Sequence, residues 1–202
     1  MEPFKILTAV AAPYDRINVD TDQILPARFL LKRRTDPEYP TYLFRDLRWD
    51  ADGRVNAEFV LNQPVYRDAK IFVGNTNFGG GSSREAAAIA FQRYGIRCVI
   101  APNFGDIFYN NSVKNGILPM RLPEAVVASL RAQLHAQPSA TLTIDLPGQV
   151  LTDVEGSRHA FEIDGFSKHC LVEGLSQIDL TLQRVELIEA FERRYRETHG
   201  WA

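Results

Sequence analysis

The residues best suited to do chemistry lie in one short stretch, residues 79–85, with the sequence Gly-Gly-Gly-Ser-Ser-Arg-Glu. It puts two hydroxyl groups and a guanidinium where a glycine-rich turn leads into a helix. The first backbone N–H groups of a helix lack partners within it and carry partial positive charge, so this position suits an anion. Arg84 adds a planar pair of donors that matches a carboxylate or a phosphate. The stretch therefore predicts an anion-binding site.

Ser82 also has a purely structural interpretation. With Glu85 three residues later it forms the pattern of a capping box, in which the serine hydroxyl only caps the helix, and the glycines would then serve only a tight turn. The stretch lacks the Gly-Lys-Ser/Thr of a nucleotide P-loop, a spaced Gly-x-Gly-x-x-Gly and the Gly-x-Ser-x-Gly nucleophile elbow. From these residues alone, the prediction stops at anion binding.

The segments on either side predict a strand–loop–helix–strand unit that positions the stretch. Residues 70–74 form a short apolar run that ends at a glycine, which is typical of a buried strand. Residues 83–94 favour a helix whose alanines allow close packing, and residues 97–101 are apolar again. Such a unit makes its two strands parallel neighbours.

Similar patterns predict the remaining elements. Strands are expected at residues 4–12, 117–122, 141–146, 149–154 and 160–163. Helices are expected at residues 104–115 and 123–136, and exposed or polar loops at 18–22 and 32–40. A helical stripe of apolar residues is expected to pack into the core and consists of Leu180, Leu187, Ile188, Phe191 and Tyr195.

Composition limits the kind of protein. The chain has 202 residues, of which 45% are hydrophobic and 24% charged, with a formal net charge of -2. This length predicts one domain, with or without an extension. The near-neutral charge gives no reason to expect nucleic acid or a membrane surface as a partner. No apolar run approaches the roughly 20 residues that span a bilayer and no secretory signal is recognisable, so we expect a cytoplasmic protein.

The cysteines and histidines argue against a metal site within this chain. Cys98 lies in an apolar, strand-like run and is expected to be a buried thiol. Neither Cys98 nor Cys170 belongs to a Cys-x-x-Cys pair, and two cysteines cannot supply the usual ligands of an iron–sulfur cluster. The four histidines are scattered, unlike zinc ligands. Any metal chemistry would need another chain.

Several longer sequence segments, taken in their order along the chain, carry more information than these local patterns. They are residues 18–26 (Asn-Val-Asp-Thr-Asp-Gln-Ile-Leu-Pro), 77–85, 100–108, 111–119 and 166–183. In this order they resemble the family of 3-isopropylmalate dehydratase small subunits, which is part of the aconitase superfamily. The resemblance covers nearly the whole chain and is of the bacterial type.

The resemblance implies an α/β fold, an aconitase-type swivelling β/β/α domain with a mixed, partly parallel sheet flanked by helices. Residues 1–202 would form this single domain, with a helical C-terminal extension from about residue 165 packed on it. It also implies a heterodimer with a large subunit, which would hold a 4Fe–4S cluster through three of its own cysteines. This chain would bind no cofactor itself.

The implied reaction is the dehydration and rehydration of a hydroxy-dicarboxylic acid, which interconverts 2- and 3-isopropylmalate in leucine biosynthesis. Removing a proton next to a carboxylate needs a strong base and stabilisation of the developing charge. The departing hydroxide needs a Lewis acid, which iron on the partner would supply. By resemblance, Ser82 is the base and acts as an alkoxide, Ser83 assists it, and Arg84 holds a substrate carboxylate.

The resemblance also implies substrate-binding residues in the segment from 21 to 34. Asp22 matches an active-site aspartate of the family, with Thr21 beside it. The following loop carries an arginine for one substrate carboxylate in the family, and Arg34 fits it best, with Arg33 and Arg28 as alternatives. The basic run at 32–34 is equally explained as a solvated turn, and the apolar run at 29–31 either lines a pocket for an alkyl group or packs in the core.

The sequence departs from the family pattern beside the implied base. Ala86 stands where the family usually has His, Gly80 where Cys or a larger residue is common, and residues 75–76 replace a segment that often carries an acidic residue. These departures leave two alternatives open: a related dehydratase subunit for another alkyl malate, of the dimethylmalate or citramalate type, and a non-catalytic, anion-binding regulatory module. The retained Ser-Ser-Arg favours the enzyme.

Overall fold

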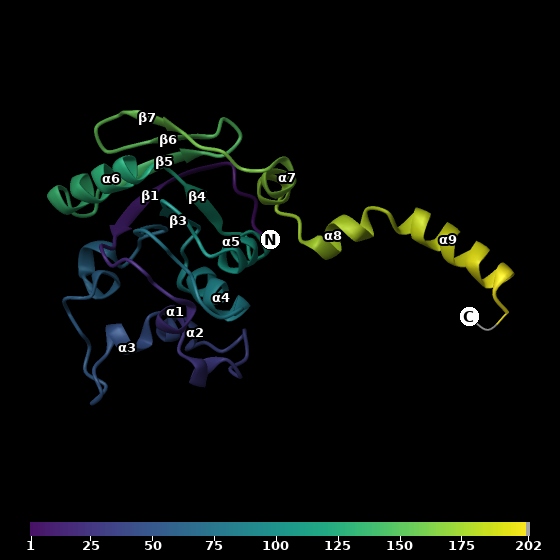
Figure 1. Cartoon of the computed structure of the whole chain (residues 1–202), viewed down its shortest axis with the longest axis horizontal. Helices are drawn as coiled ribbons and strands as arrows, with labels where there is room; N and C mark the ends of the chain where they lie inside the picture. Colours follow the sequence, from purple (N-terminus) through teal and green to yellow (C-terminus); the bar gives the residue numbers. More distant parts are fainter. Residues whose placement is uncertain (201–202) are drawn as a thin grey trace.

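A mixed sheet lies at the centre of the computed structural model, which describes residues 1–200 (Figure 1). Its strand order is β4-β3-β2-β1-β5-β6-β7. The strands are β1 (Ile6–Pro13), β2 (Ile71–Val73), β3 (Cys98–Ala101), β4 (Leu118–Arg121), β5 (Thr141–Asp145), β6 (Val150–Thr152) and β7 (Arg158–Ala160). β1 to β4 run parallel, and β5 to β7 continue the sheet from β1 as antiparallel strands. The predicted α/β fold with a partly parallel sheet is confirmed.

Helices flank this sheet, and the predicted strand–loop–helix–strand unit corresponds to β2, α4 and β3. The α-helices are α1 (Thr21–Ile24), α2 (Tyr39–Tyr42), α3 (Arg45–Arg48), α4 (Glu85–Tyr94), α5 (Asp106–Lys114), α6 (Glu124–Ala136), α7 (Gly165–Glu173), α8 (Gln177–Leu182) and α9 (Val185–Thr198). Short 3-10 helices occur at η1 (Ala27–Phe29), η2 (Val60–Asn62) and η3 (Pro64–Tyr66). Up to residue 200, no helix combines the length and apolar character needed to cross a membrane.

The third strand of the predicted meander lies earlier in the sequence than expected. The prediction gave residues 160–163, whereas β7 is Arg158–Ala160. The carboxylate of Asp153 accepts hydrogen bonds from the backbone N–H groups of Glu155 and Ser157. These bonds close a tight turn after β6, so the return strand pairs at once, with Arg158 opposite Thr152.

The parallel strands are buried on both faces. Successive side chains of a strand point to opposite faces, so Phe72 belongs to one hydrophobic cluster while Ile71 and Val73 belong to another. β3 alternates in the same way, with Val99 in the first cluster and Cys98 in the second. Cys98 is fully buried, as predicted, and burial raises the pKa of its thiol well above the usual value.

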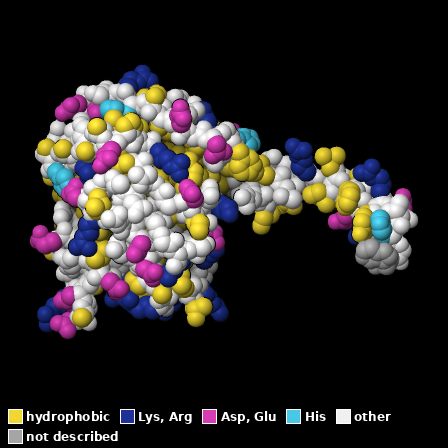
Figure 2. Space-filling view, viewed as in Figure 1, with side chains coloured by type: hydrophobic (Ala, Val, Ile, Leu, Met, Phe, Trp, Pro, Cys, Tyr) yellow, Lys and Arg dark blue, Asp and Glu magenta, His cyan; other side chains and the backbone are white. Residues whose placement is uncertain are grey.

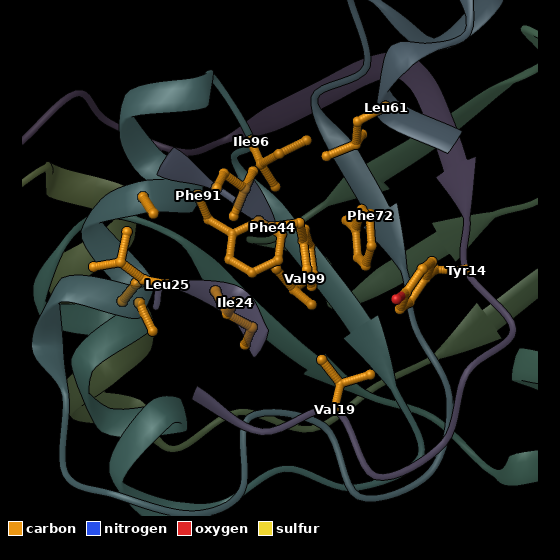
Figure 3. Close-up of a cluster of buried hydrophobic side chains, with 14 of the residues drawn as sticks. Tyr14, Val19, Ile24, Leu25, Phe44, Leu61, Phe72, Phe91, Ile96 and Val99 are labelled. Atoms are coloured by element: carbon orange, nitrogen blue, oxygen red, sulfur yellow. The ribbon is translucent and has the colours of Figure 1, made fainter. Parts of the chain in front are cut away.

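Aromatic rings fix α4 against the sheet (Figure 3). The ring of Phe91, on α4, lies 5.3 Å from that of Phe72 on β2 and 5.7 Å from that of Phe44. Phe44 and Phe72 also stack on each other, at 5.7 Å. Aromatic pairs at these distances stabilise packing beyond the area they bury. They set the position of α4, at whose start the Ser-Ser-Arg sequence lies.

The C-terminal helices differ from the sequence-based expectation. α7 packs on the body through Cys170 and Leu171, both buried, whereas α8 and α9 project from it as an arm without a buried residue (Figure 1). Leu187, Ile188 and Phe191 are exposed on α9, and hydrophobic side chains are visible along the arm in Figure 2. The prediction that this stripe packs into the core is wrong, because helical periodicity identifies an apolar face without identifying what covers it.

Two leucines, one on α7 and one on α9, test whether α7 packs on the body of the protein while α9 does not. Leu171→Ala removes a side chain that is 1% exposed and is expected to lower the free energy of unfolding by about 2–4 kcal/mol. Leu187→Ala alters a side chain that is 64% exposed, so its effect is expected within about 0.5 kcal/mol. Urea denaturation of the isolated chain measures both. Equal losses would show that α9 packs on the body.

Candidate active site

The loops that follow β1, β2 and β3 meet at one end of the sheet. Parallel strands place their carboxyl ends at the same edge, where α/β proteins commonly bind ligands. Isolated bridges join Asp20 to Gly80 and Phe78 to Phe104. The backbone N–H of Thr21 donates to the carbonyl of Gly80 at 3.0 Å. The glycine turn is therefore held between the loops on both sides.

Asparagine side chains fasten the same three loops. The backbone N–H of Asn77 donates to Oδ1 of Asn103 at 2.6 Å, and Nδ2 of Asn77 donates to Oδ1 of Asn18 at 2.9 Å. Asn18 and Asn77 have φ angles of 55° and 58°, a conformation that asparagine tolerates better than most residues. The sequence analysis did not predict these contacts. The occurrence of an asparagine in each of the three loops that follow predicted strands could have indicated them.

Two of the three glycines in the turn are required by its shape. Gly79 has a φ of +71°, and a Cβ there would collide with the ring of Phe108. Gly81 has a φ of +87° and lies against Asp20. At Gly80, by contrast, a Cβ would meet only Oδ1 of Asn77, at 3.3 Å. The departure from the family pattern at Gly80 therefore leaves the path of the turn unchanged.

Ser82 does not cap the helix. α4 begins at Glu85, its N-cap residue is Arg84, and no side chain caps it. Ser82 and Ser83 are both exposed, and neither hydroxyl is hydrogen-bonded to another of residues 1–200. The capping-box interpretation is therefore wrong, and the Ser82 hydroxyl is free to act on a ligand.

Arg84 lies between the two segments that carry the predicted residues. Its side chain is 16% exposed, and Nη1 makes an ion pair with the carboxylate of Asp22. Thr21 is buried, and its hydroxyl donates to the backbone carbonyl of Ser82 at 2.9 Å. The structure thus brings Thr21, Asp22, Ser82 and Arg84 together, although some sixty residues separate the two pairs in the sequence.

Of the three candidate arginines, Arg34 is the one that reaches α4. Its Nη2 donates to Oε2 of Glu85 at 2.6 Å. Arg28 instead pairs with the carboxylate of Asp46. Arg33 is exposed, and its side chain has no hydrogen bond or ion pair with any described residue. The geometry favours Arg34 among the alternatives that the sequence left open.

The sequence left open whether the apolar run at residues 29–31 lines a pocket or packs in the core, and its residues behave differently. Phe29 is half-buried and stacks on Tyr42, with ring centroids 4.4 Å apart. Leu31 is 98% exposed and Leu30 is 40% exposed. Phe29 therefore packs, while the two leucines remain available to contact a ligand or a partner.

Glu85 has contacts that the capping pattern did not suggest. Burial raises the pKa of its carboxyl group, but hydrogen bonds from Asn115 and Arg34 outweigh this and hold the pKa below its usual value. The group is accordingly a carboxylate at neutral pH. It adds negative charge beside the two arginines and lies next to Arg84 in the chain.

A metal site is not formed by the residues that the structure describes. Among them, no group of three or more His, Cys, Asp or Glu side chains is arranged to hold a metal ion. A separate cavity of about 360 Å³ lies beside the N-terminal residues 1–7 and Arg97, and Ser82, Ser83 and Arg84 do not line it. The candidate site is an open, polar surface rather than an enclosed pocket.

Models of known protein families match this sequence. Residues 1–125 match the family described as the aconitase C-terminal domain. Residues 178–202 match the family described as the C-terminal domain of the 3-isopropylmalate dehydratase small subunit. The first of these matches covers more than half of the chain, so the chain belongs to this aconitase-type family.

Relatives define the family within that class. The chain is 50% identical over 202 residues to the 3-isopropylmalate dehydratase small subunit of Paramagnetospirillum magneticum, covering 100% of both chains. It is 47% identical over 201 residues to that of Dinoroseobacter shibae, again over 100% of both. A crystal structure of 3-isopropylmalate dehydratase from Methanocaldococcus jannaschii superposes with a TM-score of 0.65 and 26% identity, over 93% of this chain and 99% of that one. The chain belongs to the 3-isopropylmalate dehydratase small-subunit family, as the sequence predicted.

The glycine turn can be tested with two matched substitutions. Gly79→Ala is expected to lower the free energy of unfolding by about 2–4 kcal/mol, because the φ is positive and the added methyl group overlaps Phe108. Gly80→Ala, one residue away, is expected to cost less than about 1 kcal/mol. Chemical denaturation compares them. A Gly79→Ala chain as stable as Gly80→Ala would contradict this geometry.

Proposed function

We propose that this chain is the small subunit of a cytoplasmic hydro-lyase that interconverts 2- and 3-isopropylmalate in leucine biosynthesis, with Ser82 as the base. The observation that carries the proposal is the exposed Ser82 hydroxyl, which caps no helix and lies two residues before Arg84 in the turn that leads into α4. The full-length similarity to proteins named as small subunits of this dehydratase supports the choice of reaction.

Ser82 takes the proton from the carbon next to a substrate carboxylate and donates a proton to carbon on rehydration. A serine alkoxide is unfavourable near neutral pH and needs positive charge nearby. The N–H groups at the start of α4 and the guanidinium of Arg84 supply it. Ser83 assists with its hydroxyl or N–H, since it lies between the base and Arg84.

The two arginines suit the two carboxylates of the substrate. Arg84 and Arg34 each use one nitrogen on a neighbouring carboxylate, Asp22 and Glu85 respectively, and keep other N–H groups for a ligand. In this proposal Arg84 binds the carboxylate nearest the reacting carbon and Arg34 binds the other. The exposed Leu31, three residues from Arg34, contacts the alkyl substituent.

In this proposal the site is completed by a large subunit. Ser82 and Ser83 are exposed, and proton abstraction by an alkoxide requires that water be excluded. The chain has two cysteines, and residues 1–200 form no group of side chains arranged to hold a metal ion, so in this proposal the 4Fe–4S cluster would be bound by the large subunit, where it would act as the Lewis acid for the leaving hydroxide.

The departures from the family pattern do not favour a different function. Gly80 leaves the turn unchanged, and Ala86 is half-buried and packs against the first hydrophobic cluster. Ser82, Ser83 and Arg84 are retained, and full-length relatives at 47–50% identity are named as small subunits of 3-isopropylmalate dehydratase. Isopropylmalate is therefore preferred over another alkyl malate, and catalysis over a regulatory role.

The test of the base is Ser82→Ala in the complex with the large subunit, reconstituted without oxygen. Hydration of isopropylmaleate is expected to fall by at least about a hundredfold in kcat, the lower range for loss of a general base. Ser129→Ala, which alters an exposed serine on α6, serves as the matched control and keeps full activity. Undiminished activity of Ser82→Ala would refute the assignment. A wild-type chain that adds no activity to a cluster-loaded large subunit would favour the regulatory module.

The arginines are compared in the same assay. Arg34→Ala is expected to raise KM for isopropylmalate by roughly tenfold or more, because a charge-assisted hydrogen bond to the substrate is lost. Arg33→Ala is expected to have the smaller effect, since no contact draws Arg33 toward α4. A larger KM effect at Arg33 would reassign the substrate carboxylate to that residue.

A further inference from the structure

One carboxylate joins the loop that carries Arg34 to two helices. Glu85 is the first residue of α4 and directly follows Arg84. Its Oε2 accepts from Nη2 of Arg34 at 2.6 Å, and its Oε1 accepts from Nδ2 of Asn115 at 3.1 Å. Both oxygens of Glu85 are therefore used, one for the loop and one for the end of α5.

Asn115 is itself fixed. Its Nδ2 also donates to the backbone carbonyl of Asn111 at 2.8 Å, and its backbone N–H bonds to the last turn of α5. Nδ2 consequently points at Glu85 from a half-buried position at the end of α5. A carboxylate that is bound on one side has fewer orientations, which makes its second oxygen a defined acceptor for Arg34.

Apart from Glu85, the segment of residues 30–35 is held by a cation–π contact, in which Nζ of Lys32 lies 5.8 Å from the centre of the Tyr42 ring. Residues 30–35 are all exposed. Side chains fasten the loop on either side of this segment, through the pair of Arg28 with Asp46 and the bond from Tyr42 to Asp36 at 3.0 Å. Between them, in the part of the chain that the structure describes, the Arg34–Glu85 bond is the only side-chain hydrogen bond that ties residues 30–35 to the rest of the protein.

We propose that Glu85 is a positioning residue that holds Arg34, and with it residues 30–35, beside the Ser82–Arg84 turn so that the guanidinium is in place for a substrate carboxylate. This inference rests on the proposed function for the identity of the ligand. Glu85 binds one nitrogen of Arg34 and leaves the remaining N–H groups for that carboxylate. Because the same residue adjoins Arg84, it fixes the spacing between the two cations that a dicarboxylate has to match.

Steady-state kinetics of the complex with the large subunit test this role. Glu85→Gln is expected to raise KM for isopropylmalate roughly fivefold, within the range for a partly exposed ion pair, and to leave kcat within about twofold. In the Arg34→Ala background, Glu85→Gln is expected to add no further rise. An unchanged KM, or effects that multiply in the double variant, would overturn the proposal.

Asp46→Asn is the matched control. This variant removes the carboxylate that pairs with Arg28, a residue at the start of the same loop. The Arg28–Asp46 pair is exposed to a degree similar to that of the Arg34–Glu85 pair. KM is expected to stay at the wild-type value for this variant. A rise equal to that of Glu85→Gln would show that any loosening of the loop has the same result, and would overturn the specific role of Glu85.

Limited trypsin digestion of the full chain alone tests the anchoring without any enzyme assay. Trypsin cleaves after arginine, and Arg33 and Arg34 lie in the exposed segment. Cleavage there is expected to be severalfold faster in Glu85→Gln than in the wild type or in Asp46→Asn. Faster cleavage supports the anchoring even if the wild-type complex fails to act on isopropylmalate. Unchanged cleavage overturns it even if that activity is present.

Discussion

The candidate site depends on three hydrogen bonds between the loop after β1 and the glycine turn after β2. Gly79 donates to the carbonyl of Val19 at 2.6 Å, Thr21 donates to that of Gly80 at 3.0 Å, and the Thr21 hydroxyl reaches the carbonyl of Ser82 at 2.9 Å. These bonds form because Gly79 takes up a positive φ and approaches Phe108 more closely than any side chain would allow. They set Asp22 beside Arg84 and leave Ser82 exposed.

Much of the fold follows from short sequence patterns. β2 and β3 are buried on both faces, so their apolar runs were recognisable, and the helix predicted at residues 123–136 corresponds to α6, which buries Val127, Leu130 and Leu134. The arm formed by α8 and α9 was not predictable in this way. An apolar stripe such as that of Leu187 and Phe191 has the same spacing whether the body of the protein covers it or not.

The candidate site shows more clearly which features local sequence patterns cannot predict. Ser82 and Glu85 fit a capping box by spacing, but the helix starts at Glu85 itself, so the serine lies outside it. The Glu85 carboxylate instead binds Arg34 and Asn115, which are 51 and 30 residues away in the sequence. No local window contains such partners. The order of the sequence blocks identified the family, and the geometry places Arg34, rather than Arg28, against α4.

In the proposed mechanism, the Ser82 oxygen removes a proton bound to carbon. Its most direct test follows hydrogen exchange in deuterium oxide, using the complex with the large subunit and isopropylmalate. Mass spectrometry and calorimetry would measure deuterium uptake at carbon and substrate binding separately. If Ser82 is the base, the wild type takes up deuterium at carbon, and the Ser82→Ala variant binds substrate without uptake. Uptake at the wild-type rate in the alanine variant would contradict it.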